Sequence, residues 1–158
     1  MKFLKKAARL SMIALPIFLS SIVPRAFAAE SPARKDTQWG ITIIKKDVTS
    51  TAKFYPYTVD GKPMEIFAVR ASDGTIRTAL NTCQVCYSSG RGYYKQEGRV
   101  FVCQNCGNRF SLDQIEKIKG GCNPVPIPGS GKTDLGDSIG VSKAYLESVA
   151  PYFVRWKR

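Results

Sequence analysis

The stretch NTCQVCYSSGRGYYKQEGRVFVCQNC, residues 81–106, places two Cys-x-x-Cys pairs on either side of a hairpin pattern. The pairs are Cys83 with Cys86 and Cys103 with Cys106, and 16 residues separate them. Two residues between ligands let a tight turn direct both sulfurs at one ion, and this spacing is typical of four-cysteine metal sites. We therefore predict a single metal site formed by these four cysteines.

The chain contains no histidine, so the soft ligands available to such a site are sulfurs. An all-thiolate donor set favours an iron–sulfur cluster or zinc, and it argues against histidine-bound haem, blue copper and two-histidine, one-carboxylate iron sites. Two disulfides are a further alternative in an exported protein, but a disulfide within a Cys-x-x-Cys pair is usually strained and labile. A thioredoxin-type catalyst is disfavoured because no βαβ pattern surrounds either pair.

The N-terminal residues have the pattern of an export signal. Basic residues precede an apolar run over 10–23, and Ala26-Phe27-Ala28 forms an A-x-A cleavage site. The apolar run has 14 residues, whereas a membrane span needs roughly 20. We predict a signal peptide over 1–28, a linker over 29–37 and one metal-binding domain over 38–158. The predicted location is periplasmic or otherwise extracytoplasmic, with an N-terminal anchor in the inner membrane as the alternative.

The charge of the chain does not indicate nucleic-acid binding. Residues 1–28 contain five basic and no acidic residues, so the formal charge of +12 becomes +7 after cleavage. The remaining basic residues are dispersed and form no stripe with interleaved aromatics, so we expect no nucleic-acid partner. Such a surface suits an anionic membrane face or an acidic redox partner, although we expect no spanning helix in the mature chain.

One motif resembles the end of a phosphate-binding loop, at residues 129–133 (GSGKT). That motif needs a glycine five residues before Gly131, and Pro126 occupies the position. We therefore predict a flexible connector here and no nucleotide site.

Alternating apolar runs predict a mainly β fold, a small antiparallel β domain with short helices and a C-terminal helix. Asp60-Gly61 and Asp73-Gly74 are strong hairpin signals. Both cysteine pairs are expected in loops directly after strands. The segment 122–128 is rich in proline and predicted to be extended, neither helix nor central strand. The predicted strands cover 39–44, 52–59, 64–70 and 75–80, a hairpin covers 93–102, and helices are predicted over 112–119 and from Ser142 onward.

Three segments in sequence resemble the layout of a Rieske ferredoxin domain: DGTIRTALNTCQVC (73–86), GRVFVCQNCGNRFSL (98–112) and GGCNPVPIP (120–128). Each Rieske ligand loop supplies one cysteine and one histidine, whereas both loops here supply two cysteines. The resemblance therefore implies an all-cysteine variant of the Rieske-like layout.

A closer resemblance covers residues 54–153. The stretch NTCQVCYSSGRGYYKQEGRVFVCQNCGNRF (81–110) together with GGCNPVPIP is similar to the FtrD-like family of bacterial membrane-associated iron–sulfur proteins, which is linked to iron-permease systems. The resemblance implies an iron–sulfur cluster on Cys83, Cys86, Cys103 and Cys106. It also implies an envelope redox partner or an iron-permease component as partner. In that family the domain often follows several membrane helices, which this chain lacks.

Cys122 is a fifth, unpaired cysteine between Gly121 and Asn123. A small buried apolar residue is the simplest interpretation of such a cysteine. The flanking Gly-Gly and Asn-Pro resemble the segment that lies against the cluster in Rieske domains. We therefore expect Cys122 to lie beside the centre or to act as an alternate ligand.

These patterns predict an exported electron carrier with an iron–sulfur centre, linked to bacterial iron uptake or envelope redox chemistry. The alternative is a structural, zinc-ribbon-like binding module without redox activity. The signal lacks the twin arginine of folded-protein export, with Lys5-Lys6 in its place, which favours zinc or iron loaded after export. No nucleophile–base or carboxylate pair stands out, so an independent enzyme is less expected, and Tyr93 and Tyr94 are assigned to a hairpin face.

Overall fold

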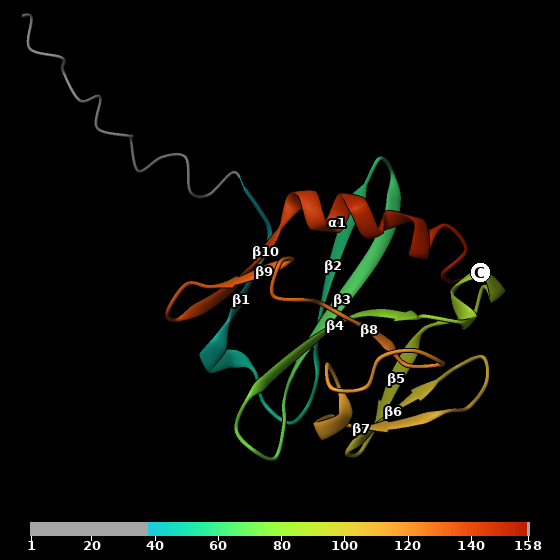
Figure 1. The fold of residues 1–158 in the computed structure, drawn as a ribbon, viewed down its shortest axis with the longest axis horizontal. Helices are drawn as coiled ribbons and strands as arrows, with labels where there is room; N and C mark the ends of the chain where they lie inside the picture. The colour runs from blue at the N-terminus through green and yellow to red at the C-terminus, as the bar shows by residue number, and fades with distance from the viewer. Residues whose placement is uncertain (1–37, 158) are drawn as a thin grey trace, which may run out of the picture. The chain divides into compact units, whose positions relative to one another are not determined.

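The structure is a computed structural model, and it describes residues 38–157. The predicted signal peptide and linker lie outside these residues. The described part of the chain contains three antiparallel sheets (Figure 1), which confirms the predicted mainly β, antiparallel fold. The first sheet contains β1 (Trp39–Ile44), β10 (Ser138–Ser142) and β9 (Lys132–Asp134); the second contains β2 (Lys53–Val59), β3 (Lys62–Arg70), β4 (Ile76–Cys83) and β8 (Pro124–Pro126); the third contains β5 (Tyr94–Glu97), β6 (Val100–Cys103) and β7 (Arg109–Ser111).

The helical elements are short. The helix predicted from Ser142 is confirmed: α1 spans Lys143–Val149, and the Ser142 hydroxyl accepts a hydrogen bond of 3.1 Å from the Tyr145 N–H. No helix within residues 38–157 is long and apolar enough to cross a membrane. The remaining helical turns are of the 3-10 type: η2 (Lys45–Asp47), η3 (Cys86–Ser89), η4 (Leu112–Gln114) and η5 (Ala150–Phe153).

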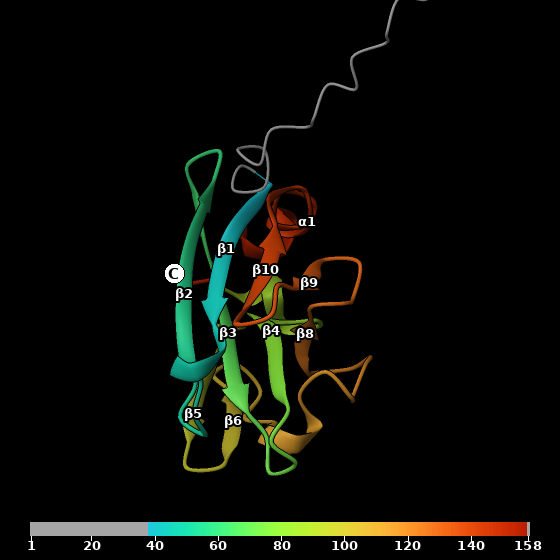
Figure 2. The ribbon, with the colours of Figure 1, turned by 90° about the vertical axis from the view of Figure 1, so that its left-hand side faces the viewer.

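Strand β3 separates two hydrophobic cores because successive side chains on a strand point to opposite faces. Ile66 and Ala68 point into the core shared with the first sheet and α1, whereas Phe67 and Val69 point into the core shared with the third sheet. All four side chains are fully buried. Figure 2 shows α1 at one end of the domain and β5 and β6 at the other. Of the predicted cysteine ligands, Cys83 and Cys103 belong to the second core, the one shared with the third sheet, and Cys86 packs against it, whereas Cys106 is exposed.

Two sequence predictions were wrong in extent. The helix expected over 112–119 is reduced to η4, because the backbone adopts a φ of 66° at Glu116, outside the right-handed helical region. The connector expected over 129–133 already includes the start of β9 at Lys132. The prediction for 122–128 is confirmed: β8 is extended, contains two prolines and pairs only with β4 at the edge of its sheet.

Candidate metal centre

The first cysteine of each pair is the last residue of a strand. Cys83 ends β4 and Cys103 ends β6, so the expected loop position holds only for Cys86 and Cys106. Cys83 and Cys103 are buried, Cys86 is half-buried and Cys106 is exposed. Each pair therefore combines one cysteine fixed by a sheet with one on the turn that follows it.

Local hydrogen bonds hold the strand-end cysteines. The N–H of Cys83 donates to the Gly92 carbonyl at 2.6 Å, and the N–H of Cys103 donates to the Asn108 carbonyl at 2.9 Å. A Cβ on Gly92 would lie 2.2 Å from the Cys86 carbonyl oxygen, so only glycine allows the chain to pass this closely. The Gly-rich loop thus closes tightly over the first Cys-x-x-Cys turn.

The segment that follows η4 brings Cys122 to the same place. Cys83 pairs with Pro124 in the β4–β8 ladder, and the Gln84 N–H donates to the Asn123 carbonyl at 3.1 Å. The Asn123 side-chain amide is buried and donates to the carbonyls of Ile118 at 3.1 Å and Pro124 at 3.0 Å. These bonds hold Cys122 against the end of β4.

The sulfurs of all five cysteines converge. The Sγ of Cys122 lies 3.1 Å from that of Cys83, 3.8 Å from that of Cys86 and 2.6 Å from that of Cys106. The sulfurs of Cys83, Cys86, Cys103 and Cys122 all lie within 4.8 Å of one another. Three of the four predicted ligands, Cys83, Cys86 and Cys103, therefore share this group with Cys122, and the sulfur of the fourth, Cys106, contacts that of Cys122. Which four of the five bind the metal stays a prediction.

This arrangement fits a thiolate-bound metal. Sulfurs around a tetrahedral ion with metal–sulfur bonds of about 2.3 Å lie about 3.8 Å apart, which is within the spread of the four-sulfur group. The Cys86 N–H donates to the Cys83 sulfur at 3.2 Å. Hydrogen bonds of this kind stabilise a thiolate and tune a cluster. The donor set alone suits both an iron–sulfur cluster and zinc.

Protons are shared unequally among these sulfurs. A hydrogen bond from Cys103 holds the pKa of Cys83 well below its ordinary value, against the effect of burial. The same hydrogen bond raises the pKa of Cys103, and burial adds to that rise. Burial, followed by hydrogen bonds to Cys106 and Cys83, raises the pKa of Cys122. Because a metal binds thiolates, loading this site requires loss of the protons retained by the other sulfurs.

Tyr94 is a contact of the site that sequence reasoning did not find. It lies in β5 as the hairpin prediction required, and it pairs with Cys103 across the β5–β6 ladder. The side chain is buried, and its hydroxyl oxygen lies 3.9 Å from the Cys122 sulfur. Burial, and then hydrogen bonding to Cys83, raises the pKa of Tyr94 far above its ordinary value, so the phenol stays protonated. No spacing in the sequence distinguishes it from Tyr93.

Glu116 anchors the segment that leads to Cys122, and it too was missed. Its Oε1 accepts hydrogen bonds of 2.6 Å from both the N–H and the hydroxyl of Thr78, in the middle of β4. The same oxygen forms an ion pair with the Lys132 ammonium. Thr78 is fully buried, and the N–H of Ile127, directly after β8, donates to its carbonyl. Glu116 therefore supplies the acceptor that a regular strand would offer to the Thr78 N–H.

Comparison with known proteins identifies the family. The model of the family described as "Membrane iron-sulfur containing protein FtrD-like" matches residues 48–153, which is most of the domain. No curated protein and no solved structure matches the chain. The Rieske-like layout thus stays a prediction. The predicted iron–sulfur cofactor agrees with the family description and with the cysteine group that could hold a metal. The chain belongs to the FtrD-like family of membrane iron–sulfur proteins.

Proposed function

We propose that this protein is an exported one-electron carrier that serves bacterial iron uptake or envelope redox chemistry. The observation that carries the proposal is the convergence of five cysteine sulfurs, in a protein whose family is described as iron–sulfur containing. An iron–sulfur cluster supplies reversible one-electron chemistry when bound. No other cluster of metal-ligating side chains competes with this one among residues 38–157.

The protein's own contribution would be to hold the ligands and limit access of water. Cys83 and Cys103 are buried in the second core with Phe67 and Phe101, whereas Cys106 is exposed. A centre held here would have one side in an apolar environment and one side near the surface. Burial and hydrogen bonds to the sulfurs are the features that set a cluster potential. The exposed side, at Cys106, is where we expect an envelope redox partner or an iron-permease component to approach.

The ligand set is the second part of the proposal. We assign Cys83, Cys86, Cys103 and Cys106 as ligands, with Cys122 beside the centre or as an alternate ligand. The short sulfur–sulfur distance of 2.6 Å between Cys106 and Cys122 makes these two the natural competitors for one coordination position. Serine variants of each cysteine, with Ser89→Ala in the same turn as control, separate the roles.

The main experiment is anaerobic purification from an iron-replete host, followed by iron, sulfide and zinc analysis and visible absorption. We expect iron and sulfide, with visible bands that bleach on reduction. Serine variants of Cys83, Cys86 and Cys103 should lose metal. If Cys106→Ser loses the metal and Cys122→Ser retains it, the assignment is supported. If Cys122→Ser loses the metal and Cys106→Ser retains it, Cys122 is the fourth ligand. A colourless protein with one zinc would instead favour the structural module.

A further inference from the structure

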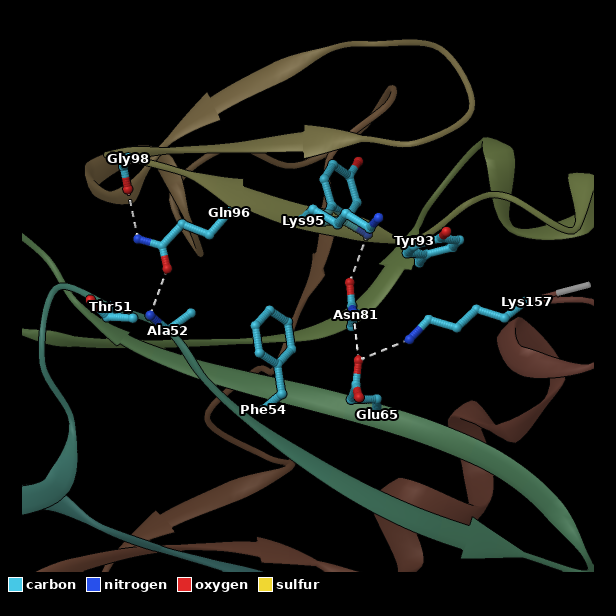
Figure 3. Close-up of a pocket in the computed structure, with 11 residues that line it drawn as sticks. Thr51, Ala52, Phe54, Glu65, Asn81, Tyr93, Lys95, Gln96, Gly98 and Lys157 are labelled. Atoms are coloured by element: carbon cyan, nitrogen blue, oxygen red, sulfur yellow. Dashed lines mark hydrogen bonds and ion pairs between the residues drawn. The ribbon is translucent and has the colours of Figure 1, made fainter.

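A cavity of about 660 Å³ lies next to the cysteine centre, between β5 and the second sheet, which contains β2, β3, β4 and β8 and is the central sheet of the domain (Figure 3). This volume falls within the roughly 300–1,000 Å³ typical of small-molecule sites. Its lining includes the aromatic residues Phe54, Tyr93 and Tyr94, of which Tyr94 is fully buried, and a polar cluster formed by Glu65, Asn81 and Lys157. Aromatic walls with a few convergent polar groups are typical of binding sites for small ring-shaped ligands.

The polar cluster positions one carboxylate. The buried Asn81 side chain donates from Nδ2 to Glu65 Oε1 at 2.6 Å and accepts from the Tyr94 N–H at 2.8 Å through Oδ1. The Lys157 ammonium lies 3.5 Å from the same Oε1. Both contacts use Oε1, and within residues 38–157 no hydrogen bond to Oε2 is present. Glu65 therefore offers a fixed acceptor to a hydroxyl donor in the cavity.

The Gln96 side chain, which also lines the cavity, has no such capacity. The carbonyl oxygen of the Gln96 side chain accepts from the Ala52 N–H at 2.6 Å, and its NH₂ group donates to the Ser50 and Gly98 carbonyls at 2.7 and 2.8 Å. Figure 3 shows the bonds of Gln96 to Ala52 and Gly98. Gln96 therefore links β5 to the chain before β2, and Glu65 is the group available to a ligand.

The charges of the cavity favour a neutral ligand. An anion would face the Glu65 carboxylate, whereas a cation would face the Lys157 ammonium and Lys95, the other charged residue of the lining. That ammonium also lies 4.9 Å from the Tyr93 ring centroid and 4.1 Å from the Trp156 ring centroid, so the aromatic side of the cavity already contacts a cation. A neutral ring with a hydroxyl group matches both the aromatic walls and the free oxygen of Glu65.

Tyr94 belongs to both the cavity and the cysteine centre. It is one of the residues that line the cavity, its side chain is buried in the core, and its hydroxyl lies 3.9 Å from the Cys122 sulfur. One aromatic side chain thus separates a bound ring from the thiol group. No other residue that lines the cavity contacts a cysteine sulfur among the hydrogen-bonded pairs of the described residues.

We infer that the cavity binds a neutral dihydroxyaromatic reductant of the hydroquinone class, with one hydroxyl on Glu65 and the ring between the aromatic walls. The inference that this ligand binds rests on the cavity alone, whereas the inference that it transfers an electron also rests on the proposed function. In that step one O–H bond breaks, its proton passes to Glu65 Oε2, and one electron passes beside Tyr94 to the oxidised centre. The neutral aromatic radical leaves, and two such radicals disproportionate to one quinone and one hydroquinone.

The test is a titration of the metal-loaded protein with methylhydroquinone under anaerobic conditions, followed by backbone amide NMR shifts and calorimetry. We expect saturable binding with shifts at the cavity residues. Glu65→Gln should weaken binding about tenfold, because a hydrogen bond to a charged acceptor is lost. Phe54→Leu should also weaken binding, because it removes an aromatic ring from the cavity lining. Glu97→Gln, exposed on β5, is the matched control and should bind as the unaltered protein does.

The outcomes separate this inference from the proposed function. No saturable binding, or equal affinity in Glu65→Gln, overturns the site. Equal affinity for 1,4-dimethoxybenzene, which has no hydroxyl donor, overturns the role of Glu65. If methylhydroquinone binds but only dithionite bleaches the centre, the electron step is wrong and the binding site stands. If dithionite also changes nothing, the proposed electron carrier is wrong, and the titration still decides the binding site.

Discussion

Removal of the Glu116 carboxylate should destabilise the domain by about 2–3 kcal/mol. In Glu116→Ala the buried Thr78 N–H loses its acceptor, and an unsatisfied buried donor costs about 1–3 kcal/mol. Loss of the Lys132 ion pair adds about 1 kcal/mol, because the Lys132 ammonium keeps a hydrogen bond of 2.9 Å to the Thr78 hydroxyl and is not left without a partner.

Two further variants separate the carboxylate from the backbone. Glu116→Gln keeps an oxygen acceptor for Thr78 and loses only the ion pair, so it should cost about 1 kcal/mol. Glu116→Gly loses the carboxylate but relieves the positive φ of 66°, a conformation that costs a residue with a Cβ about 1 kcal/mol. We therefore expect Glu116→Gln to be the most stable of the three variants, Glu116→Gly to be intermediate and Glu116→Ala to be the least stable.

Thermal and urea unfolding of the metal-loaded protein measure this order, with Glu147→Ala, an exposed position on α1, as control. A loss of 1 kcal/mol should lower Tm by about 4 °C in a domain of this size. The loop that carries Cys122 should also loosen, and so faster alkylation of Cys122 is expected in Glu116→Ala after metal removal. Unchanged stability in Glu116→Ala, or equal losses in the Ala and Gly variants, would refute the reasoning.

Three other substitutions probe the packing that surrounds the centre. Gly92→Ala should cost several kcal/mol and release metal, since its Cβ would lie 2.2 Å from the Cys86 carbonyl oxygen; metal content compared with Gly129→Ala, at an open turn without positive φ, checks this. Leu146→Ala should lower the free energy of unfolding by about 3 kcal/mol, because Leu146 is fully buried, and a loss as small as that in exposed Val154→Ala would contradict the packing. Ser142→Ala should cost about 1 kcal/mol through loss of the N-cap of α1, with Ser142→Thr expected to restore most of it in urea unfolding.

Hydrophobic alternation was sufficient to predict β1 to β6, but it missed β10, whose Ile139 and Val141 are buried on either side of Gly140. It failed where a strand continues through polar residues. The strand predicted to end at residue 80 reaches Cys83 because Asn81 and Thr82 are buried and find partners far away in sequence. Asn81 bonds to Glu65 and to the Tyr94 N–H, and Thr82 donates to the Tyr152 carbonyl. Tertiary hydrogen bonds of this kind leave no local signal.

The Cys-x-x-Cys spacing was sufficient to locate the centre but not to define its surroundings. A loop connects the second cysteine pair to Cys122, and its path depends on Glu116. The sequence pattern, by contrast, places Glu116 in a helix. Tyr94 contacts the sulfurs because the β5–β6 register puts it opposite Cys103, and one residue of slip would have presented Tyr93 instead. Register and loop path are set by the whole fold, so neither could be predicted from spacing alone.

Both edges of the central sheet carry proline. The sheet order places β2 at one edge, with Pro56 in its middle, and β8 at the other, with Pro124 and Pro126. Proline has no N–H to donate, so neither edge offers an uninterrupted row of donors to an incoming strand. Extension of this sheet by a strand from a second molecule is therefore disfavoured at both ends. A protein that docks here must recognise side chains and loops, and unfolded neighbours find no template for aggregation along the sheet that carries Cys83.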